Sequence, residues 1–133
     1  MSDISFADLG LAEEVLEAVQ KAGYEVPSPI QQQAIPALLK GKNLLGTAQT
    51  GTGKTAAFSL PLLSTLNFSH STPAMLVLTP TRELSIQVAE AIQSFAIAMP
   101  KIRALAIYGG QDINVQLKAL KCNISIVVAT PGR

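Results

Sequence analysis

Residues 48–55, Ala-Gln-Thr-Gly-Thr-Gly-Lys-Thr, constrain this chain more than any other stretch. The apolar run 43–47 leads into them, and a helical pattern follows over 56–60. A strand, a glycine-rich turn and a helix that begins with Lys-Thr are the context that a phosphate-binding loop requires. Gly51 and Gly53 permit backbone angles that a side chain would forbid, so the loop's N–H groups can converge on an anionic oxygen. The stretch therefore predicts a nucleotide phosphate site.

Two side chains of this stretch carry chemistry. Lys54 offers a mobile positive charge for the β- and γ-phosphates, and the positive end of the helix dipole lies behind it. The hydroxyl of Thr55 can ligate Mg²⁺. Ala48 stands where the general pattern has its first glycine, so an ordinary βα turn with a surface lysine is the alternative interpretation. The strand and helix patterns on either side favour the phosphate site.

Composition limits the classes of protein that this chain can be. With 133 residues, of which 48% are hydrophobic, it is long and apolar enough for one globular domain with a core. A net charge of +1 means that any nucleic-acid binding must come from localised groups. The single cysteine, Cys122, fits a reducing compartment. Because we see neither a secretory signal nor an apolar run of membrane-spanning length, we expect a cytoplasmic protein.

Apolar strand patterns alternate with helical patterns along the whole chain. This alternation predicts an α/β fold with a parallel sheet and helices on both faces, whose ligand sites lie beyond the carboxyl ends of the strands. The uninterrupted run 74–78 is typical of a strand buried on both faces. In the helix expected over 112–121, Val115, Leu117 and Leu120 are the apolar positions. The expected strands are 43–47, 74–78, 102–108 and 124–129, and the expected helices are 11–22, 29–40, 53–66, 82–98 and 112–121.

Polar and aromatic side chains outside the loop are weaker signals. Ser28 followed by Pro29 predicts a helix start, which places Gln31 in the first turn. A glutamine there is usually solvated, but its carboxamide also suits the N6/N7 edge of adenine. Phe6 is more simply a residue that covers the core than a ligand contact. His70 has no partner at metal spacing, so we expect it to be solvated.

Five stretches together resemble the motifs of DEAD-box ATP-dependent RNA helicases, in the order of that family. Residues 23–31, with Tyr24, Pro27 and Gln31, resemble the Q motif, and Phe6 lies at the position of its upstream aromatic residue. Residues 48–55 resemble motif I, which in this family normally begins with alanine. The resemblance covers the whole chain and implies the amino-terminal RecA-like P-loop domain. The flanking sequences are most similar to bacterial cold-shock members.

The other three motifs fall at the carboxyl ends of expected strands. Residues 80–84 resemble motif Ia, although Ser85 replaces the usual alanine, a small-for-small change that we expect to be harmless. Gly109 and Gly110, followed by Gln116, resemble the GG motif, and residues 130–133 resemble motif Ib.

The resemblance implies a role for each matching residue. ATP and Mg²⁺ would be the cofactors, with Gln31 reading adenine, Phe6 packing on its ring, Lys54 and Thr55 acting at the phosphates and Thr55 holding the metal. Nucleotide-binding residues would be Phe6, Gln31, Thr50, Gly51, Thr52, Gly53, Lys54 and Thr55. Contacts to the backbone of single-stranded RNA, which read no sequence, would come from Thr81, Arg82, Gly109, Gly110, Thr130, Gly132 and Arg133.

Parts of the family pattern do not occur in these residues. The sequence contains no Asp-Glu-Ala-Asp motif and no second RecA-like domain. By resemblance we therefore expect residues 1–41 to form a Q-motif helical region and 42–133 an incomplete RecA-like P-loop domain. The 133 residues alone should hydrolyse no ATP and bind RNA weakly. A different P-loop ATPase and a non-enzymatic module that binds RNA or a partner protein remain alternatives.

The implied topology also predicts unpaired strands. In a RecA-like sheet the strand over 43–47 is not adjacent to the other three, so runs such as 75–78 and 124–129 should border a gap. Exposed apolar strand edges invite pairing with another chain. We therefore expect self-association or marginal stability.

Overall fold

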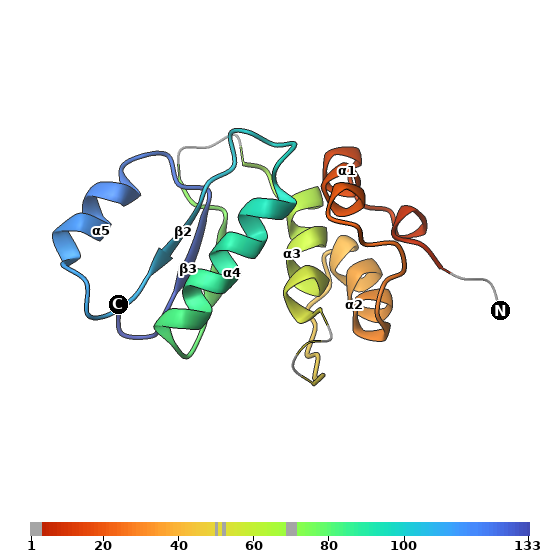
Figure 1. Cartoon of the computed structure of the whole chain (residues 1–133), viewed down its shortest axis with the longest axis horizontal. Helices are drawn as coiled ribbons and strands as arrows, with labels where there is room; N and C mark the ends of the chain where they lie inside the picture. Colours follow the sequence, from red (N-terminus) through yellow and green to blue (C-terminus); the bar gives the residue numbers. More distant parts are fainter. Residues whose placement is uncertain (1–3, 50, 52, 69–71) are drawn as a thin grey trace. The chain divides into compact units, whose positions relative to one another are not determined.

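A computed structural model describes residues 4–49, 51, 53–68 and 72–133. The chain divides into two compact units, one of Met1–Leu66 with Phe95–Ala98 and the other of Asn67–Ser94 with Met99–Arg133. Figure 1 shows α1, α2 and α3 within the first unit and the strands with α4 and α5 within the second. The elements are η1 (Phe6–Leu9), α1 (Glu13–Lys21), α2 (Pro29–Leu39), α3 (Lys54–Thr65), β1 (Met75–Leu78), α4 (Arg82–Phe95), β2 (Ala104–Ile107), α5 (Ile113–Leu120) and β3 (Ile126–Ala129).

All five expected α-helices are confirmed, with ends within a few residues of the expected ones. In α1, Val15, Ala18 and Val19 are buried. The chain leaves α1 through Gly23, whose φ of 85° is in the left-handed region that glycine adopts readily. No helix in the described residues is long and apolar enough to cross a membrane.

Helices α2 and α3 pack against each other and form the core of the first unit. Ile35 of α2 and Leu60 and Leu63 of α3 are almost fully buried. Each helix contains a proline, Pro36 and Pro61, which removes one N–H from the helical hydrogen bonds. The helices continue through both prolines because burial of their apolar faces outweighs the lost bond.

The prediction of a strand over 43–47 is wrong. The structure describes these residues and assigns them no strand. Leu45 is 94% exposed and Leu44 is 46% exposed, so their side chains gain little from burial. An extended segment becomes a strand only when another strand accepts and donates its hydrogen bonds, and among the described residues no strand pairs with this one.

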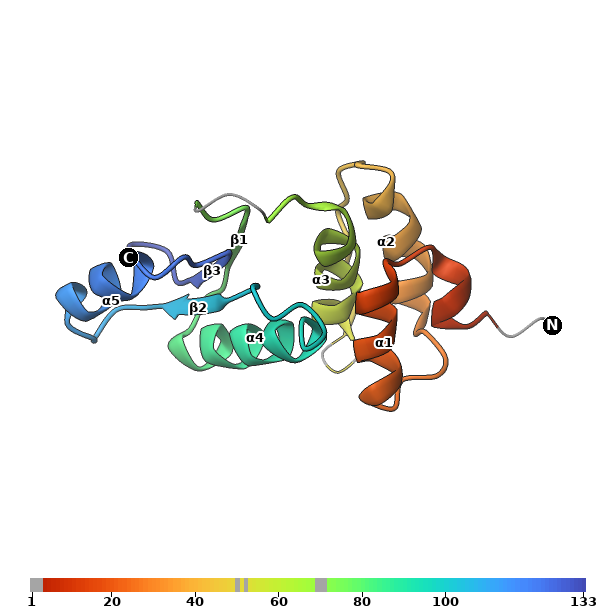
Figure 2. The same cartoon turned by 90° about the horizontal axis from the view of Figure 1, so that it is seen from above.

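The second unit contains a parallel sheet in the order β1-β3-β2. Met75 and Ala104 both lie opposite Ile126, so the three strands are in register. The connection through α4 crosses the sheet in one direction and that through α5 returns, so right-handed crossovers place these helices on opposite faces. Figure 2 shows α4 running alongside the strands. This is the α/β fold with a parallel sheet that the sequence predicts.

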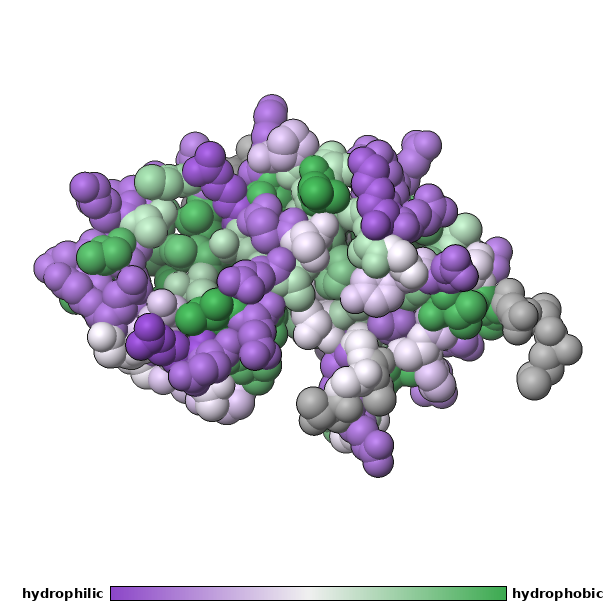
Figure 3. Space-filling model, viewed as in Figure 1, coloured by the Kyte–Doolittle hydropathy of each residue, from purple (hydrophilic) through white to green (hydrophobic). Residues whose placement is uncertain are grey.

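Three details of the second unit differ from expectation. β3 is paired on both sides, so 124–129 borders no gap, and the sheet edges are β1 and β2. The strand β1 is not buried on both faces, because Leu76 is 65% and Leu78 63% exposed. In α5, Val115 and Leu117 are about half exposed, whereas Gln116 is buried. On the face seen in Figure 3, hydrophobic side chains gather over α5 and β2.

Candidate functional site

The glycine-rich loop leads directly into α3. Gly53 caps the helix with a φ of 82°, and Gly51 has a φ of 86°, so both use backbone angles that favour glycine. Lys54, the first residue of α3, is exposed, and Thr55 is half-buried. The loop therefore ends at a helix N-terminus with an accessible ammonium group, an arrangement that suits a phosphate. Thr50 and Thr52 lie outside the described residues.

Gln31 contacts this loop directly. Ser28 and Gln31 form a capping box at the start of α2, in which the Ser28 N–H donates to Gln31 Oε1 at 2.9 Å. Gln31 Nε2 donates to the Gly53 carbonyl at 3.2 Å, across 22 residues of sequence. A Cβ atom at Gly53 would lie 2.1 Å from Nε2, so any side chain there would displace the glutamine. The starts of α2 and α3, two positive dipole ends, therefore lie together.

The Gln31 side chain keeps part of its hydrogen-bonding capacity. It is only 4% exposed, so Gln31 is not solvated, as a glutamine in the first turn of a helix usually is. A carboxamide has two N–H donors and two lone pairs on its oxygen. The bonds to Ser28 and Gly53 use one of each, and one N–H and one lone pair stay unused among the described residues. These two groups lie on the same carboxamide, as an adenine N6/N7 edge requires.

Phe6 lies in η1 with its side chain 3% exposed. Its ring meets that of Tyr24 edge to face, with centroids 6.2 Å apart. Asp8 fixes the start of η1, because the Ser5 N–H and hydroxyl donate to its carboxylate and hold the pKa of that carboxyl below its usual value. Phe6 thus covers the core of the first unit. An adenine ring could contact only the small exposed part of the Phe6 side chain.

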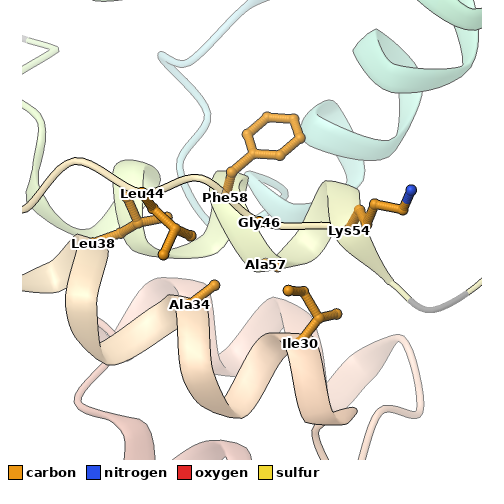
Figure 4. A pocket seen from close by; sticks show the side chains of 8 residues that line it. All are labelled: Ile30, Ala34, Leu38, Leu44, Gly46, Lys54, Ala57 and Phe58. Carbon is orange, nitrogen blue, oxygen red and sulfur yellow. The ribbon is translucent and has the colours of Figure 1, made fainter. Parts of the chain in front are cut away.

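An apolar pocket of about 330 Å³ lies between α2, the 43–47 segment and α3. Figure 4 shows Leu38 and Leu44 beside each other at one end, with Ile30 and Ala34 of α2 along the floor. The Lys54 side chain extends away from Ile30 at the other end. The pocket therefore combines an apolar wall with a single cationic rim residue.

The residues expected at RNA lie in the second unit, after the three strands. Thr81 caps α4, because its hydroxyl accepts the Leu84 N–H at 3.2 Å. Arg82 is the first residue of α4 and is exposed. Thr130 follows β3, and its N–H donates to Ile107 of the neighbouring β2 at 3.0 Å. Because the strands are parallel, these segments all lie where the carboxyl ends of the strands meet, which we call the carboxyl edge of the sheet.

Side-chain contacts connect these segments. The Arg82 guanidinium lies over the Tyr108 ring, 4.9 Å from its centroid. Arg133 Nη2 donates to the Gln111 carbonyl at 3.0 Å. A hollow of about 380 Å³ lies here, with a lining of Gly109, Ile113, Thr130, Pro131, Gly132 and Arg133. Of the RNA set, the structure places Gly109, Thr130, Gly132 and Arg133 around one hollow.

Sequence reasoning missed two members of this edge, Tyr108 and Gln111. Neither belongs to a quoted motif, although both flank Gly109 and Gly110. The described residues contain no cluster of three His, Cys, Asp or Glu side chains that could hold a metal ion. Thr55, the Mg²⁺ ligand that the sequence predicts, is half-buried in the first turn of α3.

Comparison with known proteins decides the family. A family model described as DEAD/DEAH box helicase matches residues 28–133. The chain belongs to this family. The ATP-dependent RNA helicase DeaD of Escherichia coli K12 is 56% identical over 131 residues, and that of Haemophilus influenzae is 55% identical over 130 residues. A crystal structure of a DEAD box protein from Methanococcus jannaschii matches with a TM-score of 0.89 and 43% identity.

The matches cover this chain far more completely than they cover the relatives. Both DeaD alignments span 98% of this chain but only 21% of the relative, and the structural match spans 97% of this chain and 35% of the other. This DEAD-box chain thus corresponds to about a fifth of the length of its DeaD relatives. The structural match agrees with a RecA-like fold of the DEAD-box type.

Proposed function

We propose that these residues are the nucleotide-binding part, and one section of the RNA-binding surface, of a cytoplasmic ATP-dependent RNA helicase. In the whole protein, RNA-stimulated ATP hydrolysis would drive local unwinding of RNA duplexes. We further propose that 1–41 form a Q-motif helical region and 42–133 part of the RecA-like domain. The observation that carries the proposal is the bond from Gln31 to Gly53, which joins a carboxamide suited to adenine to a phosphate-type loop.

Several features of the described residues support an adenine nucleotide as the ligand. Phosphates would lie at the start of α3, where the dipole and Lys54 favour negative charge and Gly51 has open space around its Cα. Gln31 would offer its remaining N–H and lone pair to adenine, and Phe6 would lie beside the ring. Gly51, Gly53, Lys54 and Thr55 would hold the phosphates together with Thr50 and Thr52, which lie outside the described residues.

Magnesium would arrive with the nucleotide. Mg²⁺ takes oxygen ligands and usually keeps phosphate oxygens and waters with one or two protein groups. The Thr55 hydroxyl would be one such group, since Thr55 is half-buried in the first turn of α3. The metal would supply charge neutralisation at the phosphates, while Lys54 and Thr55 would be the catalytic residues of this chain.

RNA would contact the carboxyl edge of the sheet. Arg82 and Arg133 offer positive charge there, and the turns at Gly109, Gly110 and Gly132 let a sugar–phosphate backbone approach closely. Thr81 and Thr130 would add hydroxyl contacts. With two arginines rather than a basic face, binding should be weak and strongly dependent on salt.

Nucleotide titration of this chain tests the proposal. By calorimetry with ATP, ADP and GTP, ATP and ADP should bind more tightly than GTP. Lys54→Ala should weaken ATP and ADP binding about ten- to a hundredfold, because a charge-assisted hydrogen bond contributes about 1.5–3 kcal/mol. Gln31→Ala should mainly reduce the preference for ATP over GTP, by about tenfold, since it removes hydrogen bonds to the base.

Gln33→Ala is the matched control for Gln31. Gln33 lies in the same turn region of α2 and is exposed, so its loss should leave the ATP to GTP ratio unchanged. Equal affinity of the unmodified chain for ATP and GTP would remove the adenine-reading role of Gln31. Unchanged binding in Lys54→Ala would remove the phosphate site.

A further inference from the structure

Tyr108 is a side chain at the sheet edge for which the proposed function gives no role. It follows β2 directly and precedes the turn at Gly109 and Gly110. Its ring is half-buried, and the Arg82 guanidinium lies over it at 4.9 Å. A guanidinium at this distance from an aromatic ring is attracted by the ring's negative face. The ring therefore limits where the Arg82 side chain can go.

Apart from its contact with the Tyr108 ring, the charge of Arg82 is not neutralised within the described part of the chain. The ion pair found among the described residues joins Lys21 to Glu17, and Arg82 has no carboxylate partner there. Arg82 is also exposed, at the N-terminus of a 14-residue helix. A flexible arginine would lose conformational entropy on binding an anion. Stacking on Tyr108 removes part of that loss beforehand.

The main chain of Tyr108 is itself fixed. Gln116 of α5 is 3% exposed, and its Nε2 donates to the Tyr108 carbonyl and to Gln111 Oε1, both at 2.8 Å. The Gln111 carbonyl in turn accepts from Arg133 Nη2 at 3.0 Å. A continuous set of contacts thus leads from Arg82 through Tyr108, Gln116 and Gln111 to Arg133. The backbone that carries the Tyr108 ring is therefore held by a hydrogen bond from a buried side chain.

We propose that Tyr108 is a positioning residue for RNA binding: its ring holds the Arg82 guanidinium at the carboxyl edge of the sheet, ready for a backbone phosphate. This inference rests on the proposed RNA-binding function. Tyr108 acts through Arg82 and makes no independent contact with RNA. The phenol hydroxyl has no part in it, so phenylalanine should replace tyrosine without loss.

The test uses fluorescence anisotropy of the chain with a labelled single-stranded oligouridine, over a salt series that begins low because binding is electrostatic. Tyr108→Leu should weaken binding about two- to fivefold, the range of an exposed cation–π contact. Tyr108→Phe should bind like the unmodified chain. Arg82→Ala should weaken binding and reduce the slope of log K against log salt by about 0.7, one phosphate contact to a single strand.

A double variant separates positioning from direct contact. Arg82→Ala with Tyr108→Leu should bind like Arg82→Ala alone, because the ring acts only through the arginine. Additive losses, or equal losses in Tyr108→Phe and Tyr108→Leu, would overturn the proposal. Arg103→Ala is the charge control, since Arg103 precedes β2 at the opposite end of the strand. It should leave the binding and the salt slope nearly unchanged.

Further measurements keep the outcomes distinct. Circular dichroism checks that each variant folds, and Tyr108→Met replaces Tyr108→Leu if the leucine variant does not. No oligouridine binding by the unmodified chain even at the lowest salt would contradict the proposed RNA-binding surface itself. Binding that depends on Arg82 but is unaffected by either Tyr108→Leu or Tyr108→Met would leave that surface in place and overturn the positioning role.

Discussion

Ser85 lies in the first turn of α4, and its side chain contacts the residue that follows β1, Thr79. Its side chain is fully buried, and its hydroxyl donates to the Thr81 carbonyl at 3.1 Å and forms a hydrogen bond with the Thr79 hydroxyl. Thr79 is 5% exposed, and its hydroxyl has two partners, the Ser85 hydroxyl and the Thr81 carbonyl, the latter at 3.4 Å. The serine in place of the family's usual alanine therefore has a structural role at the turn that carries Arg82.

Ser85→Ala should lower the free energy of unfolding by about 1 kcal/mol, because the buried Thr79 hydroxyl loses one of its two partners and keeps only the Thr81 carbonyl at 3.4 Å. Urea unfolding followed by circular dichroism measures the change. Ser94→Ala is the control: Ser94 also bonds to a carbonyl of its own helix, at Ala91, but it is exposed, so its loss should cost under about 0.5 kcal/mol. Equal stabilities of Ser85→Ala and the unmodified chain would show that the alanine-to-serine difference is neutral.

At the level of single residues, local signals were predictable and tertiary contacts were not. Ser28 and Pro29 predict the start of α2 from capping chemistry alone, and the structure places it there. The bond from Gln31 to Gly53 depends on how α2 packs on α3, which no local pattern encodes. Gln116 is similar: its Nε2 donates to two acceptors, at Tyr108 and Gln111, that only the fold brings near.

At the level of elements, the apolar runs separate into paired and unpaired segments. The β3 strand lies between β1 and β2 and is almost fully buried at Ile126 and Val128. Residues 43–47 contain the apolar pair Leu44 and Leu45 but form no strand, and Leu45 is exposed. Hydrophobic pattern predicts where a chain favours a strand, whereas pairing needs a neighbour. This is why the sequence predicts three of the strands correctly and the one at 43–47 wrongly.

Hydrogen exchange should show this difference directly. In a mass-spectrometric exchange experiment on the chain, peptides that cover 43–47 should exchange almost as fast as an unfolded peptide, because no strand protects their amides. Peptides that cover β3 should be the most protected of the second unit, since both sides of β3 are paired. The same exchange measured with added nucleotide serves as the comparison. Strong protection of 43–47 without nucleotide would contradict the assignment of no strand to these residues.

At the level of the whole molecule, the sheet has an open and apolar edge. Among the described residues, β1 has β3 as its one pairing partner, and its Leu76 and Leu78 are each more than 60% exposed. Flat edges with exposed apolar side chains are the sites at which strands of different chains pair. We therefore propose that 133-residue chains associate through β1, with the unpaired backbone groups of that strand forming new hydrogen bonds.

Size-exclusion chromatography with light scattering tests the association at concentrations on the order of 0.1 mM, where such contacts become populated. The unmodified chain should elute as a concentration-dependent oligomer or aggregate. Leu76→Lys should shift it toward monomer, because a charge at a strand edge opposes pairing. Leu117→Lys is the matched control, since Leu117 is 50% exposed but lies on α5. A compact monomer with a sharp thermal transition above about 50 °C, ordinary for a mesophilic domain, would show that β1 does not drive association.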